Sequence, residues 1–408
     1  MNELKHFTCN LRFMRLAIFL FLVLISINIL FAQKDVQKRI QTQLIDAEDG
    51  ATIEIPEGRF EFDGSLSLDG KKNVTIKGAG LDKTIMNFKG QLSGAEGIKI
   101  TNASNITVQD LTVQDTKGDG IKAQLVEGIT FKNVKTEWSN EGLSSNGGYG
   151  LYPVQCTNIL IENCVAVGAS DAGIYVGQSK HIIVRYSKAY QNVAGIEIEN
   201  SWYADVYENE AFNNTGGILV FDLPDLIQKE GGYVRVFKNK IIDNNHINFA
   251  PKGNTVGKVP QGTGVMILAT RNVEVFDNRI VNNISAGTAI VSYYITENPI
   301  NDKVYKPFPS NIYIHDNFYE RPNVKATSKG RLGKMYKFKL RFGKNVPHIL
   351  YDGIEDSSMK DRKICIRNNQ NASFANIDAG NKFKNKSRDM KPYECEQPPI
   401  APVVLTMK

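Results

Sequence analysis

Gly173-Ile174-Tyr175-Val176 and Gly195-Ile196-Glu197-Ile198 repeat one pattern, a glycine followed by alternating apolar residues, at a separation of 22 residues. The step recurs with its leading glycine at positions 97, 120, 150, 173, 195, 217 and 264. Most separations are 22 or 23 residues, and we interpret the exceptional 47-residue separation as about two coils plus a short excess. A fixed period in this range is typical of stacked repeats, so the sequence predicts a solenoid.

Each repeat also contains a second short, β-branched strand, as in Asn158-Ile159-Leu160-Ile161. Residues 97–320 show no helical period, which disfavours helical solenoids and α/β folds. Alternation within the strands predicts one internal column formed by Ile121, Leu151, Ile174, Ile196 and Ile218. The expected fold is therefore all-β, a single-stranded right-handed parallel β-helix.

Asparagines recur at equivalent turns, where they can accept left-handed geometry and bond to the coils above and below. We expect structural ladders from two groups: Asn133, Asn163, Asn209, Asn239, Asn278 and Asn317 after the second strand, and Asn192, Asn214 and Asn283 near the coil ends.

The open ends of a solenoid need covers, because an exposed edge strand recruits other chains. Val36, Ile40 and Leu44 share one face of a short amphipathic segment at 34–47, which predicts an N-terminal capping helix. We therefore divide the mature chain into a β-helix at 34–320 and a basic C-terminal segment at 321–408, which contributes part of a last coil around 363–380.

The first 33 residues have the pattern of a signal peptide. Arg12 and Arg15 precede an apolar run from Leu16 to Ala32, and a polar stretch follows. A retained N-terminal anchor is the alternative. No second apolar run is long enough to span a membrane, so we expect a periplasmic, secreted or cell-envelope protein without a span after cleavage.

Four cysteines remain after the predicted cleavage, since Cys9 leaves with the signal. Cys365 and Cys395 are expected to form a disulfide in an oxidising compartment, and Cys156 and Cys164 to be small core residues. Cysteine spacing and the few histidines do not resemble a zinc site, and no cofactor is evident.

The net charge of +6 is unevenly distributed. Residues 321–408 contain 19 basic and 8 acidic side chains, a net charge of +11. Such a segment suits an anionic polysaccharide or another anionic surface, or is simply solvated. Export disfavours nucleic acid as the partner.

Two outward columns are predicted along one face of the stack. The first contains Tyr152, Tyr175, Glu197 and Leu219, and the second contains Gln155, Gln178, Asn200 and Asp222. Aromatic rings stack on sugars, and amides both donate and accept hydrogen bonds, so the face suits a glycan. A solvated sheet face is the alternative.

Insertions near these columns, at 222–232, 245–263 and 285–310, are expected to wall a groove and to bring Asp225, His246, Lys252 and Lys258 towards it. Lyase or epimerase chemistry on a uronic acid needs a cation, a base and an acid, whereas hydrolysis needs two opposed carboxylates. The candidate catalytic residues are Glu197, Asp222, Asp171 and His246. The candidate substrate-binding residues are Tyr152, Tyr175, Gln155, Gln178, Asn200 and Lys252.

The coil run, together with Gly50-Ala51-Thr52-Ile53-Glu54-Ile55-Pro56-Glu57-Gly58, resembles the pectate-lyase-like superfamily of carbohydrate-binding and sugar-hydrolase β-helices. Within it, the stretches 149–155, 170–179 and 192–201 resemble a bacterial family of exported β-helix repeat proteins of uncharacterised function. The resemblance covers roughly residues 48–380.

Residues 149–155 are also similar in outline to the Tyr-Gly-Phe-Asp-Pro-His-Asp motif of periplasmic alginate epimerases. Where that motif has its catalytic Asp, His and Asp, this chain has Tyr152, Val154 and Gln155, so the epimerase mechanism does not transfer by motif. The leading hypothesis is an exported protein that binds an acidic polysaccharide and, as an enzyme, acts as a lyase or epimerase rather than a hydrolase. The alternative is a non-catalytic scaffold of the cell envelope that contacts an exported protein partner.

Overall fold

The computed structural model describes residues 36–140, 142–326, 334–355 and 363–406. The predicted signal peptide at 1–33 lies outside these residues. Across the described part of the chain, no helix is both long and apolar enough to cross a membrane.

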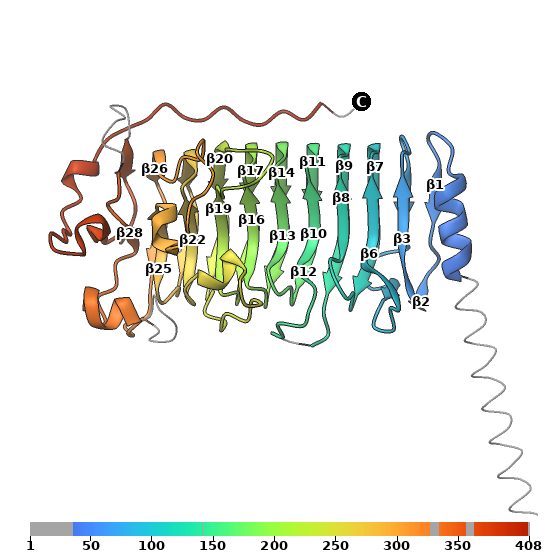
Figure 1. Ribbon diagram of the computed structural model, residues 1–408, viewed down its shortest axis with the longest axis horizontal. Coiled ribbons are helices and arrows are strands. Elements are labelled where there is room, and N and C mark those ends of the chain that lie inside the picture. Colours follow the sequence, from blue (N-terminus) through green and yellow to red (C-terminus); the bar gives the residue numbers. More distant parts are fainter. Residues whose placement is uncertain (1–35, 141, 327–333, 356–362, 407–408) are drawn as a thin grey trace, which may run out of the picture.

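Successive turns of the chain stack strand on strand, giving the elongated solenoid of Figure 1. Every pairing between named strands is parallel in the described residues, which confirms the predicted all-β parallel architecture. Within that part of the chain the strands form an eleven-stranded sheet, sheet 1, and a nineteen-stranded sheet, sheet 2.

Sheet 1 contains the glycine steps found in the sequence. Its strands are β3 (Gly64–Asp69), β6 (Ser93–Thr101), β8 (Ile121–Gln124), β10 (Tyr149–Val154), β13 (Ala172–Gly177), β16 (Ala194–Glu199), β19 (Gly216–Phe221), β22 (Thr263–Leu268), β25 (Ala286–Val291), β28 (Ile349–Tyr351) and β30 (Phe374–Asn376).

Sheet 2 bends around the other two sides of each coil. One side is formed by β1 (Thr52–Glu54), β4 (Thr75–Lys77), β7 (Ser104–Gln114), β9 (Glu127–Glu137), β11 (Thr157–Glu162), β14 (Lys180–Arg185), β17 (Trp202–Tyr207), β20 (Gly232–Phe237), β23 (Arg271–Phe276), β26 (Ser310–His315) and β29 (Ile364–Arg367). The other side is formed by the ends of β7 and β9 with β2 (Gly58–Glu61), β5 (Thr84–Asn87), β12 (Val165–Val167), β15 (Lys188–Tyr190), β18 (Glu210–Phe212), β21 (Lys240–Ile242), β24 (Arg279–Val281) and β27 (Phe318–Glu320).

The predicted internal column is confirmed. Register pairs Ile121 with Leu151, Leu151 with Ile174, and Ile174 with Ile196, which in turn pairs with Ile218. All five side chains are fully buried in one continuous apolar core. Cys156 and Cys164 are free and buried in the same core, as expected.

The interpretation of the 47-residue separation is wrong. Strand β19 pairs directly with β22, with Ile218 opposite Val265, so the interval between Gly217 and Gly264 holds a single coil. The extra length lies in two loops, at 222–231 and 243–262, on either side of β20 and β21. A loop inserted between strands leaves the stacking register intact, so sequence length alone does not count coils.

Asparagine ladders run through the stack at two turns. In one, the backbone N–H of Asn209 donates to Oδ1 of Asn239. The same backbone-to-side-chain bond joins Asn239 to Asn278, Asn278 to Asn317 and Asn317 to Asn369. The other joins Asn192, Asn214, Asn244 and Asn283. Asn133 and Asn163 have left-handed backbones but lie outside the first ladder. In the coil of Asn163, the ladder position is taken by the next residue, Cys164.

The second ladder also explains the repeated glycine. A Cβ at Gly195 would lie 2.6 Å from the carbonyl oxygen of Gly217 and 2.8 Å from Nδ2 of Asn214. These distances are shorter than a carbon contact allows, so the close approach of one coil to the next requires glycine at the step.

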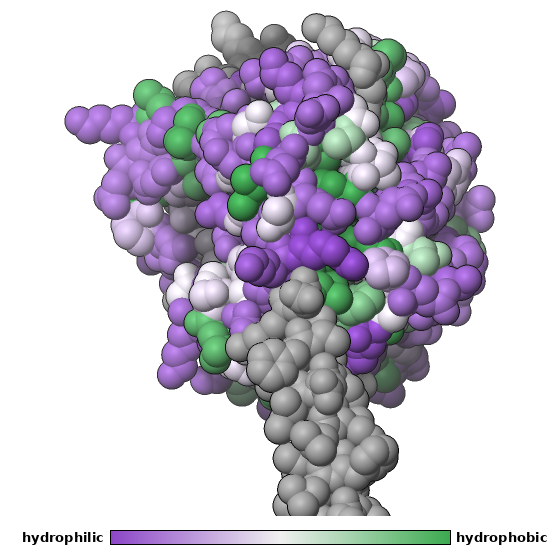
Figure 2. Space-filling view, turned by 90° about the vertical axis from the view of Figure 1, so that its right-hand side faces the viewer, coloured by the Kyte–Doolittle hydropathy of each residue, from purple (hydrophilic) through white to green (hydrophobic). Residues whose placement is uncertain are grey.

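A helix at 36–46 covers the N-terminal end, confirming the expected cap. Ile40 and Leu44 are buried and Val36 packs on the core. On the same helix, Oε1 of Gln37 and Gln41 accept the backbone N–H groups of Asp63 and Ser67 at the edge of sheet 1. Figure 2 shows this end covered mainly by hydrophilic residues, which suits a closed edge.

At the other end, β28, β29 and β30 complete the stack, and Cys365 and Cys395 form a disulfide. Beyond the disulfide, residues 396–406 run back along the outside of sheet 2, as the red trace in Figure 1 shows. Backbone N–H groups of this tail bond to side chains of the coils beneath: Ile400 to Glu274, Val403 to Asp205 and Thr406 to Asn158.

Candidate functional site

Side chains that point outward from sheet 1 form the predicted first column. Tyr175 lies opposite Glu197 and Glu197 opposite Leu219, and the column continues through Met266 and Ala289. The loops at 243–262 and 292–309 and helix η3 (Met335–Leu340) pack over it. The outer face of sheet 1 is therefore a second apolar cluster, separate from the core inside the coils.

Tyr175 is consequently not an open stacking platform, in contrast to the role proposed from the sequence. Its side chain is 4% exposed. Its ring lies 4.4 Å from that of Tyr149 and 5.0 Å from that of Tyr152, measured between centroids, and its hydroxyl donates to Oε1 of Glu199 at 2.6 Å. Tyr152 is half-buried, with the ammonium of Lys122 over its ring.

Three carboxyl groups gather beside these rings: Asp171, Glu197 and Glu199. Glu197 is 2% exposed, and its Oε2 has no hydrogen-bond partner among the described residues. Asp171 accepts a hydrogen bond at 2.7 Å from Nδ2 of Asn254, which belongs to the 243–262 loop. The loop thus closes directly on the carboxyl cluster.

Burial favours the neutral form of each of these acids. It raises the pKa of Asp171 and of Glu199 to about 7 each. The pKa of Glu197 is raised well above its usual value by burial and by the charges of Asp171 and Glu199. Burial thus favours the protonated form of Glu197, which is the form that a general acid requires.

In the predicted second column, Gln178, Asn200 and Asp222 bind the loop at 222–231. Gln155, Gln178 and Asn200 all have left-handed backbones. Oε1 of Gln178 accepts the N–H groups of Ile227 and Gln228, and Asn200 bonds to the carbonyl oxygens of Leu223 and Gln228. Gln178 and Asn200 thereby fix the 222–231 loop, whereas Gln155 accepts a hydrogen bond from Nε2 of Gln124.

Asp222 is buried under the same loop, where its Oδ2 accepts the N–H of Gly231. Burial raises the pKa of Asp222 to about 7. His246 lies with its Nδ1 2.9 Å from the carbonyl oxygen of Ile247 and its ring edge-on to Phe249, and Lys252 is exposed. Asp225 has a left-handed backbone in the 222–231 loop.

A groove of about 950 Å³ opens between the loops and the C-terminal segment. Its walls combine basic and apolar side chains with one acidic residue, Glu297. The basic ones are Lys258, Lys334, Lys339 and Lys382, and the apolar ones include Ile247, Tyr294, Met335, Phe338 and Phe383. Phe338 and Tyr294 are 62% and 47% exposed, so their rings are available to a ligand.

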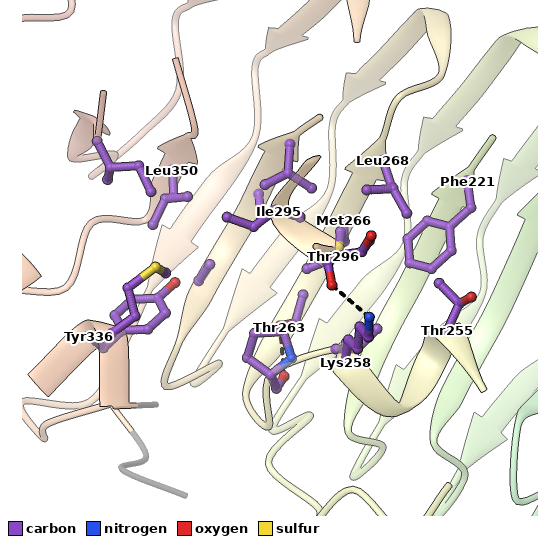
Figure 3. Close-up of a pocket in the computed structure, with 17 residues that line it drawn as sticks. Phe221, Thr255, Lys258, Thr263, Met266, Leu268, Ile295, Thr296, Tyr336 and Leu350 are labelled. Carbon is purple, nitrogen blue, oxygen red and sulfur yellow. Dashed lines mark hydrogen bonds between the residues drawn. The ribbon is translucent and has the colours of Figure 1, made fainter. Parts of the chain in front are cut away.

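A smaller apolar slot adjoins the groove and reaches the outer face of sheet 1 (Figure 3). Its base is formed by outward residues of successive strands: Phe221, Met266, Leu268, Ala289, Val291 and Leu350. Lys258 lies at its edge, where Nζ donates to the carbonyl oxygen of Thr296 at 2.6 Å.

The sequence predicted Lys258 near the site but not Lys334, Lys339 or Lys382. The available signal was the net charge of +11 in residues 321–408. That segment lacks the repeat, so no register could assign its lysines to a face. Across the described residues, no group of histidine, cysteine, aspartate and glutamate side chains is arranged to hold a metal ion.

Comparison with known proteins gives a family match. The family described as "Right handed beta helix region" matches residues 96–223 and 127–301, together half of the chain. The chain belongs to the right-handed β-helix family. This match agrees with the right-handed β-helix expected from the sequence.

Solved structures are similar to this chain at low sequence identity. The A-module of the mannuronan C-5 epimerase AlgE4 from Azotobacter vinelandii is 18% identical, covers 83% of this chain and 90% of its own, and gives a TM-score of 0.54. The AlgE6 A-module of that organism is 15% identical with the same coverage and a TM-score of 0.48. An alginate lyase from Paenibacillus sp. str. FPU-7 is 13% identical over 71% of this chain and 97% of its own, at a TM-score of 0.35. The comparison with curated proteins finds no match.

Proposed function

We propose that this β-helix protein is exported and binds an anionic polysaccharide in the groove beside helix η3. The groove is the main support for this proposal, because its volume of about 950 Å³ is lined by four lysines and by exposed aromatic rings. Ammonium groups pair with uronate carboxylates, and aromatic faces stack on sugar rings. Its volume is at the upper end of ordinary ligand sites.

Two further observations support the class and the compartment. The fold is shared with a mannuronan C-5 epimerase, which makes a polyuronate the first ligand to test. The disulfide between Cys365 and Cys395 fits an oxidising compartment, in agreement with the signal peptide predicted at 1–33. Periplasmic or secreted location is tested by fractionating cells and following the protein with an antibody.

Binding is favoured over catalysis as the primary activity. Burial raises the pKa of Asp171 and of Glu197, which suits acid–base chemistry, but Nδ2 of Asn254 in the covering loop already donates a hydrogen bond to Asp171. A sugar reaches these acids only if the 243–262 loop moves aside. Lyase activity would appear as ultraviolet absorbance from unsaturated uronate ends when a polyuronate is added.

The binding test uses calorimetric titration with a polyuronate and with a neutral glucan. We expect the polyuronate to bind and the glucan to bind weakly. Lys339→Glu and Lys382→Glu should each weaken polyuronate binding about tenfold, since each removes a charge-assisted contact and adds a repulsion.

Lys38→Glu is the matched control, because Lys38 is exposed on the capping helix at the opposite end of the solenoid. Equal losses in all three variants would mean that only net charge matters. Unchanged binding in the two groove variants would favour the scaffold alternative instead.

A further inference from the structure

The apolar slot and the basic groove form one continuous site. Their linings share six residues: Lys258, Val259, Pro260, Ile295, Thr296 and Met335. A ligand lying in the groove therefore passes the mouth of the slot. Any group that it inserts there meets the side chains of Met266, Leu268 and Val291 on sheet 1.

The size of the slot limits that group. Its volume of about 40 Å³ is a few times the roughly 10–15 Å³ that a cavity needs to hold one water molecule. Three non-hydrogen atoms make up an acetyl group. A longer acyl chain exceeds the space, and a sugar ring is far too large.

The lining of the slot also fits an acetyl group better than water. Its base is apolar, so water there finds few hydrogen-bond partners, whereas a methyl group gains from leaving solvent. One polar donor lies at the edge. The ammonium of Lys258 has three N–H bonds and already contacts Thr296 and Asn298, which leaves one for a carbonyl oxygen.

We propose that the slot recognises the acetyl substituents of an acetylated anionic polysaccharide. This inference rests on the proposed function of the groove and specifies its substrate class. The uronate carboxylates pair with Lys339 and Lys382, while the acetyl methyl enters towards Ala289 and its carbonyl faces Lys258.

The first test compares three forms of one polyuronate with the wild-type protein: the parent polymer, its acetylated derivative and its butyrylated derivative. We expect the acetylated form to bind about tenfold more tightly than the parent. The butyryl group has five non-hydrogen atoms and should not enter, so that form should bind no better than the parent. Butyrylated polymer binding as tightly as the acetylated form would overturn the slot assignment.

The second test fills the slot with Ala289→Leu, which adds three carbon atoms to its base. The preference for the acetylated polymer should disappear, while affinity for the parent, which contacts the groove alone, should stay unchanged. Ala401→Leu makes the same change at an exposed position of the C-terminal tail and should keep the preference. Thermal melting checks that both variants are folded.

The two proposals fail in different ways. If the parent and acetylated polymers bind wild-type protein equally well, and Lys339→Glu weakens both, the slot assignment is wrong and the groove proposal stands. If neither polymer binds, the proposed function is wrong and the slot assignment falls with it.

Discussion

Glu197 shows how the stack alters the chemistry of one residue. In the adjacent coils its position is taken by Tyr175 and Leu219, so its carboxyl lies between an aromatic and an aliphatic side chain. Alternation in the sequence correctly placed it outside the core, but gave no sign that loops would bury it. Burial and the neighbouring carboxyls then raise its pKa well above the usual value.

This cluster predicts a pH-dependent stability. Unfolded aspartate and glutamate ionise near pKa values of 3.8 and 4.5, whereas Asp171 and Glu199 hold their protons to about 7 in the folded protein. The folded state binds more protons between these limits, so the free energy of unfolding should fall as pH rises from about 4 to about 7. We expect melting to be lower by about 5 °C or more at pH 7.5 than at pH 5. Glu197→Gln should flatten this dependence, and an equally steep profile would contradict the assignment.

Ile196 provides a test of the core at the same scale. Its side chain is fully buried between Ile174 and Ile218. Ile196→Asp places an unpaired carboxyl there, at a cost of several kcal/mol, and should leave little folded protein by circular dichroism. Native-like spectra and melting for this variant would show that the position faces solvent. Tyr186→Asp, at an exposed turn, is the control and should fold normally.

The C-terminal tail is the element that sequence analysis did not foresee. Its N–H contacts fall at every third residue, Ile400, Val403 and Thr406, and the partners lie on every second coil, in β23, β17 and β11. Three residues of an extended chain span about 9.3 Å, and two coils span about 9.6 Å. The match depends on the spacing of the coils in three dimensions, so it could not be predicted from the sequence of a segment that has no hydrophobic periodicity.

Removing residues 397–408 should therefore loosen the stack without changing its fold. The truncation frees the carboxylates of Glu274 and Asp205 from their backbone donors, and each lost contact is worth about 1 kcal/mol. We expect melting to fall by several degrees while the far-ultraviolet spectrum keeps its β shape. Val404→Ala, at a strongly exposed tail position, should leave melting unchanged. A truncation with wild-type melting would show that the tail does not hold the coils together.

At the scale of the whole molecule, the sequence predicted the structural features that the repeat determines. Glycine spacing, internal isoleucines and the capping helix follow from contacts between adjacent coils, and they were correct. The number of coils near Gly217 was wrong, because long loops enter without disturbing register. Two of the insertions expected to wall a groove, 245–263 and 285–310, line this one, but Lys339 and Lys382 escaped prediction because they reach it from a segment that has no repeat to place them.

Hydrogen exchange with a bound polyuronate is the most direct test of the groove, because it locates the ligand on the unmodified protein. We expect slower exchange in peptides that cover 294–297, 334–340 and 382–383, with little change over sheet 2. Protection confined to sheet 2 and the tail, or no protection at a polymer concentration that saturates binding, would contradict the claim that an anionic polysaccharide occupies this groove.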